Sequence, residues 1–382
     1  MKKHKWLAAL LNFLVPGLGT AYGGKMRKAK ILYALYLILV IGWGFVTYTY
    51  LMFMVSLTVI IAFWVYIAVS GYRDVPKNMV SPSEPFNKGY YYGATFIFHV
   101  LIITFISTFL YTEVTPINFA NIPTPSMDPG LKVGDRLAYK RTSSIERNDV
   151  IIFRVPYDTT TMYAQRCIGL PGDSLRIENA IVYANNIPLM GIPVKYKYLL
   201  KNNGSEINSR ILDDYHITEH DLQKIAHDSY MIFLTDRDAQ ELRKIKSFQT
   251  VELSIARNGV REPGIFPSDL ITHNWNADFY GPLYIPKKGD RIKLTSDNIA
   301  IYLEIIKSEN DNVEMSDSGL IINGKPLIQY EFRKNYFFIM GDNRHNSLDS
   351  RYWGLLPESL VIGKALYIYW SDIPERIGMT VR

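Results

Sequence analysis

The chain has 382 residues, enough for two or three domains, and its hydrophobic content of 48% is unevenly spread along the sequence. The formal net charge is +6, but much of the positive excess lies near the amino end, and no basic stripe interleaved with aromatic residues follows it. Nucleic acid is therefore not an expected partner. The single cysteine, Cys167, excludes an intrachain disulfide framework and a zinc site built on several thiolates.

Residues 1–28 are predicted to form a basic segment at the membrane surface. Its apolar stretch, 6–22, is interrupted by Pro16–Gly19 and followed by much longer apolar runs, so a cleavable signal peptide does not fit. Two interpretations of 6–22 stay open, an interfacial or re-entrant segment and a further transmembrane helix.

The next segment has no Asp, Glu, Lys or Arg from Ile31 to Tyr72, a run of 42 residues. This is about twice the roughly 20 residues needed to cross a bilayer. We therefore predict a transmembrane helical hairpin within 29–71, turning near 48–50.

A polar loop, 72–90, and another uncharged segment, 91–111, follow the hairpin. Within that segment His99 is expected to face neighbouring helices. Basic residues at the amino end and in the loop place both in the cytoplasm. Three crossings then predict a multi-pass protein of the cytoplasmic (inner) membrane, with everything after Tyr111 on the extracytoplasmic side.

From Ile122 onward, short β-like runs alternate with turn residues, which predicts a mainly β domain in two parts, 112–194 and 286–382. Similar hairpin patterns at 181–189 and 320–327 are expected to pair in one sheet. Between the two parts, 195–285 is predicted to be an inserted α/β subdomain. The expected strands are Asp149–Val155, Arg176–Tyr183, Asp290–Thr295, Ile299–Ile306, Tyr336–Met340 and Val361–Trp370, and the expected helices within the insertion are 218–226 and 235–247.

A proline-rich stretch, Pro123–Pro129, lies shortly after the last apolar segment and carries two hydroxyl side chains, Thr124 and Ser126. The prolines favour extended backbone around them, and alternate residues of an extended strand share a face. The two hydroxyls could then form a nucleophile and an oxyanion donor. Taken alone, the stretch also reads as a turn between membrane and soluble parts.

Two further sequence blocks are Arg166–Asp173 (RCIGLPGD) and Gly341–Gly354 (GDNRHNSLDSRYWG). Taken alone, each of them has the pattern of an ordinary turn or polar loop. The block Pro125–Asp135 (PSMDPGLKVGD) precedes both in the chain, so it is the first block and the other two are the second and third. In this order, after membrane segments, the three blocks form a specific combination. The sequence resembles the bacterial type I signal peptidases, membrane-bound Ser-Lys endopeptidases that remove signal peptides from secreted proteins. The resemblance covers roughly 90–190 and 285–375.

The resemblance implies a membrane-anchored, mainly β peptidase that uses neither cofactor nor metal. Its implied partners are the signal peptides of preproteins, the lipid bilayer and the secretion machinery. It also implies a role for each matching residue. These are Ser126 as nucleophile, Thr124 in the oxyanion hole, Ser347 as the hydroxyl that orients the base, and two supporting ion pairs, Asp342 with Arg166 and Asp349 with Arg351.

The sequence departs from the family at Gln165, where the resemblance implies a lysine general base. A glutamine amide has no useful proton affinity near neutral pH, although it can hydrogen-bond Ser126 and Ser347. We therefore keep two hypotheses. One is a signal-peptide endopeptidase, and the other is a non-catalytic relative that binds signal peptides or partners an active enzyme.

Four explanations of Gln165 stay open. The chain is a catalytically weak or inactive paralogue that still recognises signal peptides, another group is the base, a rearrangement or a partner completes the site, or the glutamine is a sequence error or a deliberate inactivating change. His345 leads among substitute bases because residues two apart on a strand share a face, which would place it beside Ser347. Lys132 and Lys140 are weaker candidates.

Three other features of these blocks have structural interpretations. We expect Cys167 to pack as a small hydrophobe and Tyr352 and Trp353 to pack in the core or at the membrane surface. The arginines beside the carboxylates argue against an acidic metal site in this region. We expect ion pairs instead among Asp173, Asp342, Asp349, Arg166, Arg344 and Arg351.

Overall fold

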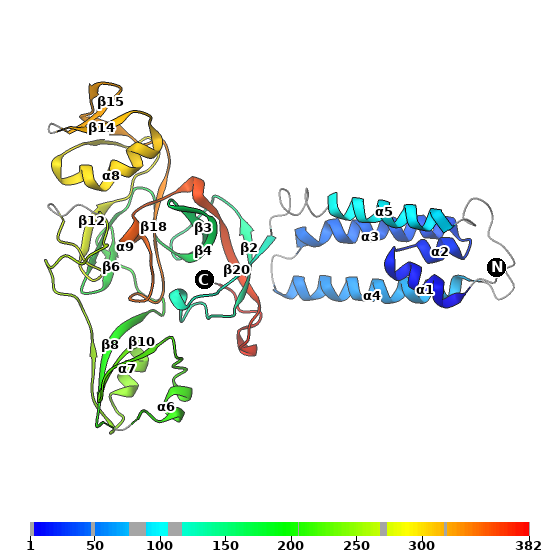
Figure 1. Ribbon diagram of the computed structural model, residues 1–382, viewed down its shortest axis with the longest axis horizontal. Helices are drawn as coiled ribbons and strands as arrows, with labels where there is room; N and C mark the ends of the chain where they lie inside the picture. Colours follow the sequence, from blue (N-terminus) through cyan, green and yellow to red (C-terminus); the bar gives the residue numbers. More distant parts are fainter. Residues whose placement is uncertain are drawn as a thin grey trace.

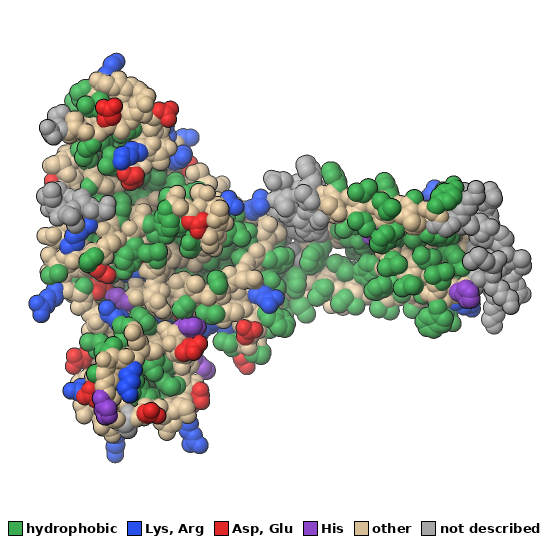
Figure 2. Space-filling model, in the orientation of Figure 1, with side chains coloured by type: hydrophobic (Ala, Val, Ile, Leu, Met, Phe, Trp, Pro, Cys, Tyr) green, Lys and Arg blue, Asp and Glu red, His purple; other side chains and the backbone are tan. Residues whose placement is uncertain are grey.

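A computed structural model of the chain has a helical part at one end and a β part at the other, with the carboxyl terminus in the β part (Figure 1). Figure 2 shows hydrophobic side chains over most of the visible face of the helical part, whereas charged side chains are scattered over the β part. The structure describes residues 4–46, 50–75, 89–105, 117–204, 206–267, 273–316 and 319–381.

The helical part contains five described helices that lie side by side (Figure 1). Among the described residues one helix, α4, is long and apolar enough to cross a membrane, and α1 and most of α5 are shorter apolar helices. Most of the predicted turn at 48–50, most of the loop 72–90 and the end of the segment 91–111 lie outside the described residues, so three crossings stay a prediction. The helices are α1 (Lys5–Leu14), α2 (Leu18–Tyr22), α3 (Met26–Val46), α4 (Tyr50–Asp74) and α5 (Gly89–Phe105).

The apolar stretch 6–22 forms two short helices, α1 and α2, neither of which alone is long enough to span a bilayer. Asn12 at the end of α1 is fully buried. Its Nδ2 donates hydrogen bonds to Thr20 Oγ1 at 3.0 Å and to the carbonyl oxygen of Ile67 on α4 at 2.6 Å. A buried polar side chain thus holds the two short helices against α4.

The β part is built around a seven-stranded antiparallel sheet. Strands distant in sequence are neighbours in it, such as β4 and β18, which carry the second sequence block and lead into the third. Aromatic contacts join this sheet to the start of α4, where the rings of Tyr50 and Tyr367 lie 6.2 Å apart. The strands, in spatial order, are β1 (Ile117–Asn121), β2 (Arg136–Arg141), β20 (Val361–Trp370), β3 (Val150–Val155), β4 (Asp158–Gly169), β18 (Tyr336–Met340) and β19 (Leu356–Pro357).

Three smaller sheets and a helix pack over one large hydrophobic core beside this sheet. They are β12 (Tyr280–Tyr284), β5 (Ser174–Glu178), β6 (Ile181–Ala184) and β7 (Ile187–Pro188); β13 (Arg291–Lys293) and β17 (Gln329–Glu331); β14 (Val313–Ser316), β15 (Gly319–Ile322) and β16 (Lys325–Pro326); and α8 (Ser296–Glu309). A short helix, α9 (Ser350–Trp353), follows the loop after β18.

Residues 195–253 form a separate four-stranded sheet with two helices and its own hydrophobic core, which we call the added sheet. The later part of the predicted insertion does not belong to the added sheet. Its strand β12 pairs with β5 and so belongs to a neighbouring sheet. The added sheet consists, in spatial order, of β11 (Phe248–Leu253), β8 (Lys195–Asn202), β10 (Ser229–Thr235) and β9 (Leu222–Ala226), with α6 (Ser209–Asp214) and α7 (Asp236–Leu242).

The prediction of a mainly β domain is confirmed, and the predicted strands 336–340 and 361–370 match β18 and β20. The predicted strand Ile299–Ile306 is wrong, because it is the middle of α8. A capping box between Thr295 and Asn298 starts this helix, and buried residues such as Ile301 and Ile305 recur at helical spacing.

Three other predicted elements also differ. Residues 218–221 form a turn leading into β9, which pairs with β10, so the helix predicted over 218–226 is wrong. The strand predicted over 176–183 is a hairpin of β5 and β6. The hairpins 181–189 and 320–327 lie in different sheets, because β6 and β15 already have a strand on each side.

Candidate active site

Ser126 lies in a short 3-10 turn, η2 (Pro125–Met127), rather than on the extended strand that the prolines predicted. Proline at the first position suits such a turn because its fixed φ is already helical and its missing N–H is not needed there. The turn still brings the two hydroxyls together, with Thr124 Oγ1 3.1 Å from Ser126 Oγ. Met127 is almost fully buried and anchors the turn.

The loop after β18 holds this turn in place. The backbone N–H of Asn343 donates to the carbonyl oxygen of Ser126 at 3.0 Å, and Asn343 Nδ2 donates to the carbonyl oxygen of Pro125 at 3.3 Å. Gly341 leaves the room for this contact, since a Cβ there would overlap Ser347 Oγ and the Ser126 carbonyl oxygen. The first and third sequence blocks therefore form one packed unit.

Gln165 is buried on β4, with 3% of its surface exposed. Its Nε2 donates to Ser347 Oγ at 2.9 Å and to the carbonyl oxygen of Leu348 at 3.2 Å. The carbonyl of Leu348 requires a donor, which fixes the orientation of the amide. Gln165 Oε1 is buried without a hydrogen-bond partner in the described part of the chain. The predicted contact with Ser347 is present, whereas the structure gives Gln165 no hydrogen bond to Ser126.

Arg166, next to Gln165, points to the opposite face of β4, as strand alternation requires. Its Nε and Nη2 lie 2.7 and 2.6 Å from the two oxygens of Asp342, and both side chains are at most 2% exposed. Such bidentate pairs are the strong form of the Arg–carboxylate interaction. This first ion pair implied by the resemblance is present.

The second ion pair, Asp349 with Arg351, is also present and fully buried, with Arg351 Nη2 2.8 Å from Asp349 Oδ2. Burial acts to lower the pKa of Arg351, but the Asp349 carboxylate outweighs it and raises that pKa. Arg351 Nη2 also donates to the carbonyl oxygen of Arg344, so the pair braces the loop that carries Ser347.

His345, the predicted substitute base, is directed away from Ser126. Its Nδ1 accepts the backbone N–H of Lys197 at 3.1 Å, and its Nε2 lies 2.7 Å from Asp278 Oδ1. The strand-face argument failed because residues 342–346 form a turn, closed by the Asn346 N–H on the Asn343 carbonyl. Burial alone would raise the pKa of Asp278, but the contacts with His345 outweigh it and the pKa lies below its ordinary value.

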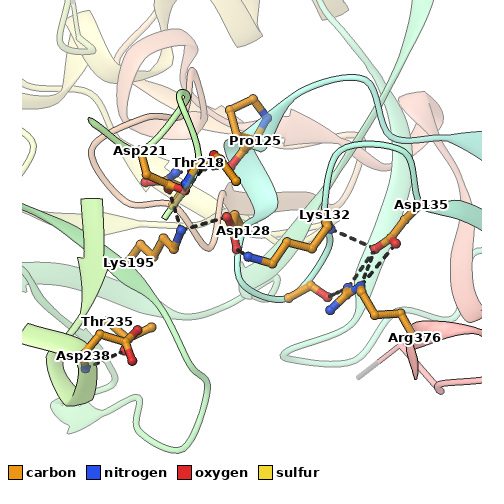
Figure 3. A network of polar contacts seen from close by, with 12 residues as sticks. Pro125, Asp128, Lys132, Asp135, Lys195, Thr218, Asp221, Thr235, Asp238 and Arg376 are labelled. Carbon is orange, nitrogen blue, oxygen red and sulfur yellow. Dashed lines mark hydrogen bonds and ion pairs between the residues drawn. The ribbon is translucent and has the colours of Figure 1, made fainter. Parts of the chain in front are cut away.

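The two lysine candidates are likewise engaged or distant. Lys132 Nζ lies 2.7 Å from Asp128 Oδ1, and Lys140 lies at the surface of β2 and does not line the cavity beside Ser126. Sequence reasoning missed a third lysine, Lys195, which is buried close to the site and paired with Asp128 and Asp221 (Figure 3). Its position in the more polar insertion, 67 residues after Asp128, gave no signal.

The remaining polar candidates have structural partners. Burial raises the pKa of the Cys167 thiol, which keeps it protonated and confirms its packing as a small hydrophobe. Asp173 pairs with Arg147 rather than Arg344, with 2.9 Å between their charged atoms. Among the described residues no group of three or more His, Cys, Asp or Glu side chains is arranged to hold a metal ion. Tyr352 and Trp353 pack against the two cores on either side of β18.

A cavity of about 560 Å³ opens beside Ser126. Its lining is mostly apolar and combines the end of β1, the Ser126 turn, residues 161–165 of β4 and the loop that carries Leu348. β1 is an edge strand, and β18 pairs with β4 only from Arg166 to Gly169. The cavity therefore lies between two backbone edges that have no strand partner on that side among the described strands.

Comparisons with known proteins identify relatives of this chain. The family model described as "Signal peptidase, peptidase S26" matches residues 90–241 and 288–370. Signal peptidase I of Buchnera aphidicola subsp. Baizongia pistaciae is 25% identical over 342 residues, covering 80% of this chain and 88% of that protein. Signal peptidase I of Aquifex aeolicus is 23% identical over 279 residues, covering 71% of this chain and 80% of that protein.

A signal peptidase I structure from Enterococcus faecalis is 17% identical, covers 58% of this chain and 96% of that one, and superposes with a TM-score of 0.23. The fold and the site define a mainly β scaffold with a serine beside an apolar cavity. By the extent of the family match, the chain belongs to the signal peptidase family, peptidase S26.

Proposed function

We propose that this chain binds the signal-peptide region of exported preproteins in the cavity beside Ser126 and, as it stands, cleaves it slowly or not at all. The cavity lies between two unpaired strand edges, which suit an extended peptide bound through main-chain hydrogen bonds. Its apolar lining, including Ala120 and Ala164, suits small apolar side chains. Family membership supports a preprotein as the ligand.

The second half of this proposal rests on Gln165, which stands where the family resemblance implies a lysine general base. The side-chain Nε2 of Gln165 donates its described hydrogen bonds to Ser347 and Leu348. A glutamine amide cannot take up the hydroxyl proton of Ser126 near neutral pH. The described alternatives, His345, Lys132 and Lys195, are each engaged with a carboxylate. A serine without a base is a poor nucleophile.

A second candidate function, cleavage with a base supplied by a rearrangement or a partner, is favoured by how completely the rest of the site is built. The hydroxyls of Thr124 and Ser126 are adjacent, and both supporting ion pairs are buried and intact. A base brought to Ser126 would find this support already in place.

We further propose that the helical part crosses the cytoplasmic membrane several times and holds the β part on the extracytoplasmic side. α4 supports one crossing. At the end of α4 distant from the β part, Lys25 and Lys28 pair with Asp74, and basic residues near helix ends favour the cytoplasmic side. At the other end, Tyr50 and Phe53 contact tyrosines of β20 near the expected membrane surface. The secretion machinery stays a predicted partner.

Binding is tested with a fluorescent peptide that spans a signal-peptide cleavage site, by anisotropy on the detergent-solubilised full chain. Ala164→Trp, which fills the cavity, should weaken binding by about tenfold or more, since bulk in a packed site is poorly accommodated. Ala226→Trp, at an exposed position of β9, is the matched control and should bind like the starting chain. No binding, or equal binding by both variants, would contradict the proposal.

A further inference from the structure

Lys195 is the first residue of β8, the strand through which the chain enters the added sheet, and its side chain is buried. Its Nζ lies 2.8 Å from Asp128 Oδ2 and 2.5 Å from Asp221 Oδ1 (Figure 3). Asp128 directly follows the turn that carries Ser126, and Asp221 directly precedes β9 of the added sheet. One ammonium group thus joins the Ser126 loop to the added sheet.

The backbone of Lys195 contacts a second segment, the loop after β18. Its N–H donates to the carbonyl oxygen of Asp342 at 2.9 Å, and its carbonyl oxygen accepts the N–H of Arg344 at 2.9 Å. Between those two residues, the N–H of Asn343 donates to the carbonyl oxygen of Ser126. Through side chain and backbone, Lys195 therefore contacts both segments that fix the Ser126 turn.

The charges around Lys195 form a cluster that is buried except for the partly exposed Lys132. Asp221 is fully buried and also accepts the N–H and hydroxyl of Thr218 at 3.0 and 2.8 Å, while Asp128 is shared with Lys132 at 2.7 Å. The positive charges of the two lysines are therefore matched by the negative charges of the two aspartates. Buried pairs of this kind hold a defined geometry, because breaking one leaves an uncompensated charge, unlike exposed pairs that contribute little.

We propose that Lys195 is a positioning residue for Ser126, through which the added sheet sets the orientation of the Ser126 hydroxyl toward Thr124 and the cavity. The loop has a second anchor at its far end, where Arg376 Nη2 lies 2.7 Å from Asp135 Oδ2 (Figure 3). The Lys195 anchor lies nearer to Ser126 in the chain. The added sheet is accordingly part of the framework of the site.

The first test measures peptide binding by the full chain, a readout that rests on the proposed function. Lys195→Met should weaken binding by about tenfold or more, because a small displacement of a positioned group costs much of its effect. Lys195→Arg keeps a cation for both carboxylates and should retain most of the affinity. The matched control is Lys201→Met, on the same strand, whose exposed ammonium lies 3.5 Å from Asp228. It should bind like the starting chain.

A second readout does not need peptide binding. In full-length Ser126→Cys the new thiol reacts with a maleimide, while the buried Cys167 stays unreactive. Adding Lys195→Met should change the labelling rate, and adding Lys201→Met should leave it unchanged. Circular dichroism checks that each variant is folded.

Equal binding and equal labelling in the Lys195→Met and Lys201→Met variants would overturn the role of Lys195 and leave the proposed function standing. If the starting chain binds no peptide, the proposed function fails, and the labelling rates alone decide on Lys195. If Lys195→Met does not fold, Asp221→Asn replaces it in both measurements. An asparagine side chain can still accept from Thr218, whereas the charge contact with Lys195 is lost.

Discussion

The framework of the site, by which we mean its two buried ion pairs, differs from residue 165, the position proposed for the base, in how the buried polar groups are satisfied. In the framework, Arg166 and Asp342 meet in a bidentate pair, and Arg351 bonds both Asp349 and a backbone carbonyl. At the base position, Gln165 satisfies its donors but leaves Oε1 buried without a described partner. The framework also holds the fold together, whereas the base is needed only for chemistry.

Under the proposal that residue 165 is the position of the base, this difference explains how a site can lose its base and keep its shape. Removing one partner of a buried ion pair leaves a charge without compensation, which destabilises the whole domain. Replacing a lysine with glutamine at 165 removes the charge and keeps a donor for Ser347. The fold therefore constrains Arg166 and Asp342 much more tightly than residue 165.

The largest expected effect of breaking the framework comes from Arg166→Met. It should lower the free energy of unfolding by about 3–5 kcal/mol, because Asp342 stays buried without its partner. Arg176→Met is the matched control, since its pair with Glu178 is exposed, with 3.4 Å between charged atoms, and should contribute less than about 1 kcal/mol. Chemical denaturation measures both, and similar losses in the two variants would contradict the comparison.

His345→Ala tests whether His345 belongs to the framework or to the chemistry. Loss of its contacts with Asp278 and the Lys197 N–H should lower the free energy of unfolding by about 1.5–3 kcal/mol, the range for hydrogen bonds to charged groups. In a Gln165→Lys background it should leave the rate of peptide cleavage unchanged. Loss of cleavage without loss of stability would instead make His345 a base.

Ser347→Ala tests a residue that contacts both regions of the comparison. Ser347 accepts a hydrogen bond from Gln165 and lies in the loop that the Asp349–Arg351 pair braces. The substitution removes one hydrogen bond from Gln165 Nε2, which keeps the Leu348 carbonyl as acceptor, so the loss of stability should be about 1 kcal/mol. Denaturation midpoints measure it. A loss as large as that of Arg166→Met would place Ser347 among the essential supports of the fold.

The smallest effect near neutral pH concerns Asp278, whose pKa is lower in the folded chain than in the unfolded one. The unfolded chain then binds the proton more readily, so this contribution to stability is present above the unfolded pKa and lost as pH falls through the folded value. Melting temperatures should show no contribution from Asp278 to pH dependence between about pH 5 and 8, and a loss only in strong acid. Asp278→Asn should remove the contribution of Asp278 to the fall of the melting temperature in strong acid. An unchanged fall in this variant would contradict the assignment to Asp278.

The sequence predicted the strands that follow simple patterns, such as β18 and β20, because alternation and turn residues are local signals. It failed at α8, where a short apolar run fits both a strand and a helix until packing decides. It also failed for the hairpins, because pairing depends on which strand edges are already occupied.

At the site, the motifs predicted the adjacent hydroxyls and both buried ion pairs, since these residues lie within three recognisable blocks. The motifs placed His345 wrongly, because the turn at 342–346 removes the strand alternation on which that prediction depended. Lys195 could not be predicted, because its partners, Asp128 and Asp221, are brought together only by the folded loop and the added sheet.

Cleavage of a preprotein by the purified full chain tests the central claim, that the site lacks only its base, most directly. The starting chain should release mature product slowly or not at all, whereas Gln165→Lys should raise the rate by about 10²–10⁴-fold, the usual contribution of a general base, and adding Ser126→Ala should abolish it. Mass spectrometry of the products identifies the cut. Ser126-dependent cleavage by the starting chain as fast as that by Gln165→Lys, or no cleavage by a folded Gln165→Lys variant that binds the preprotein, would contradict this account.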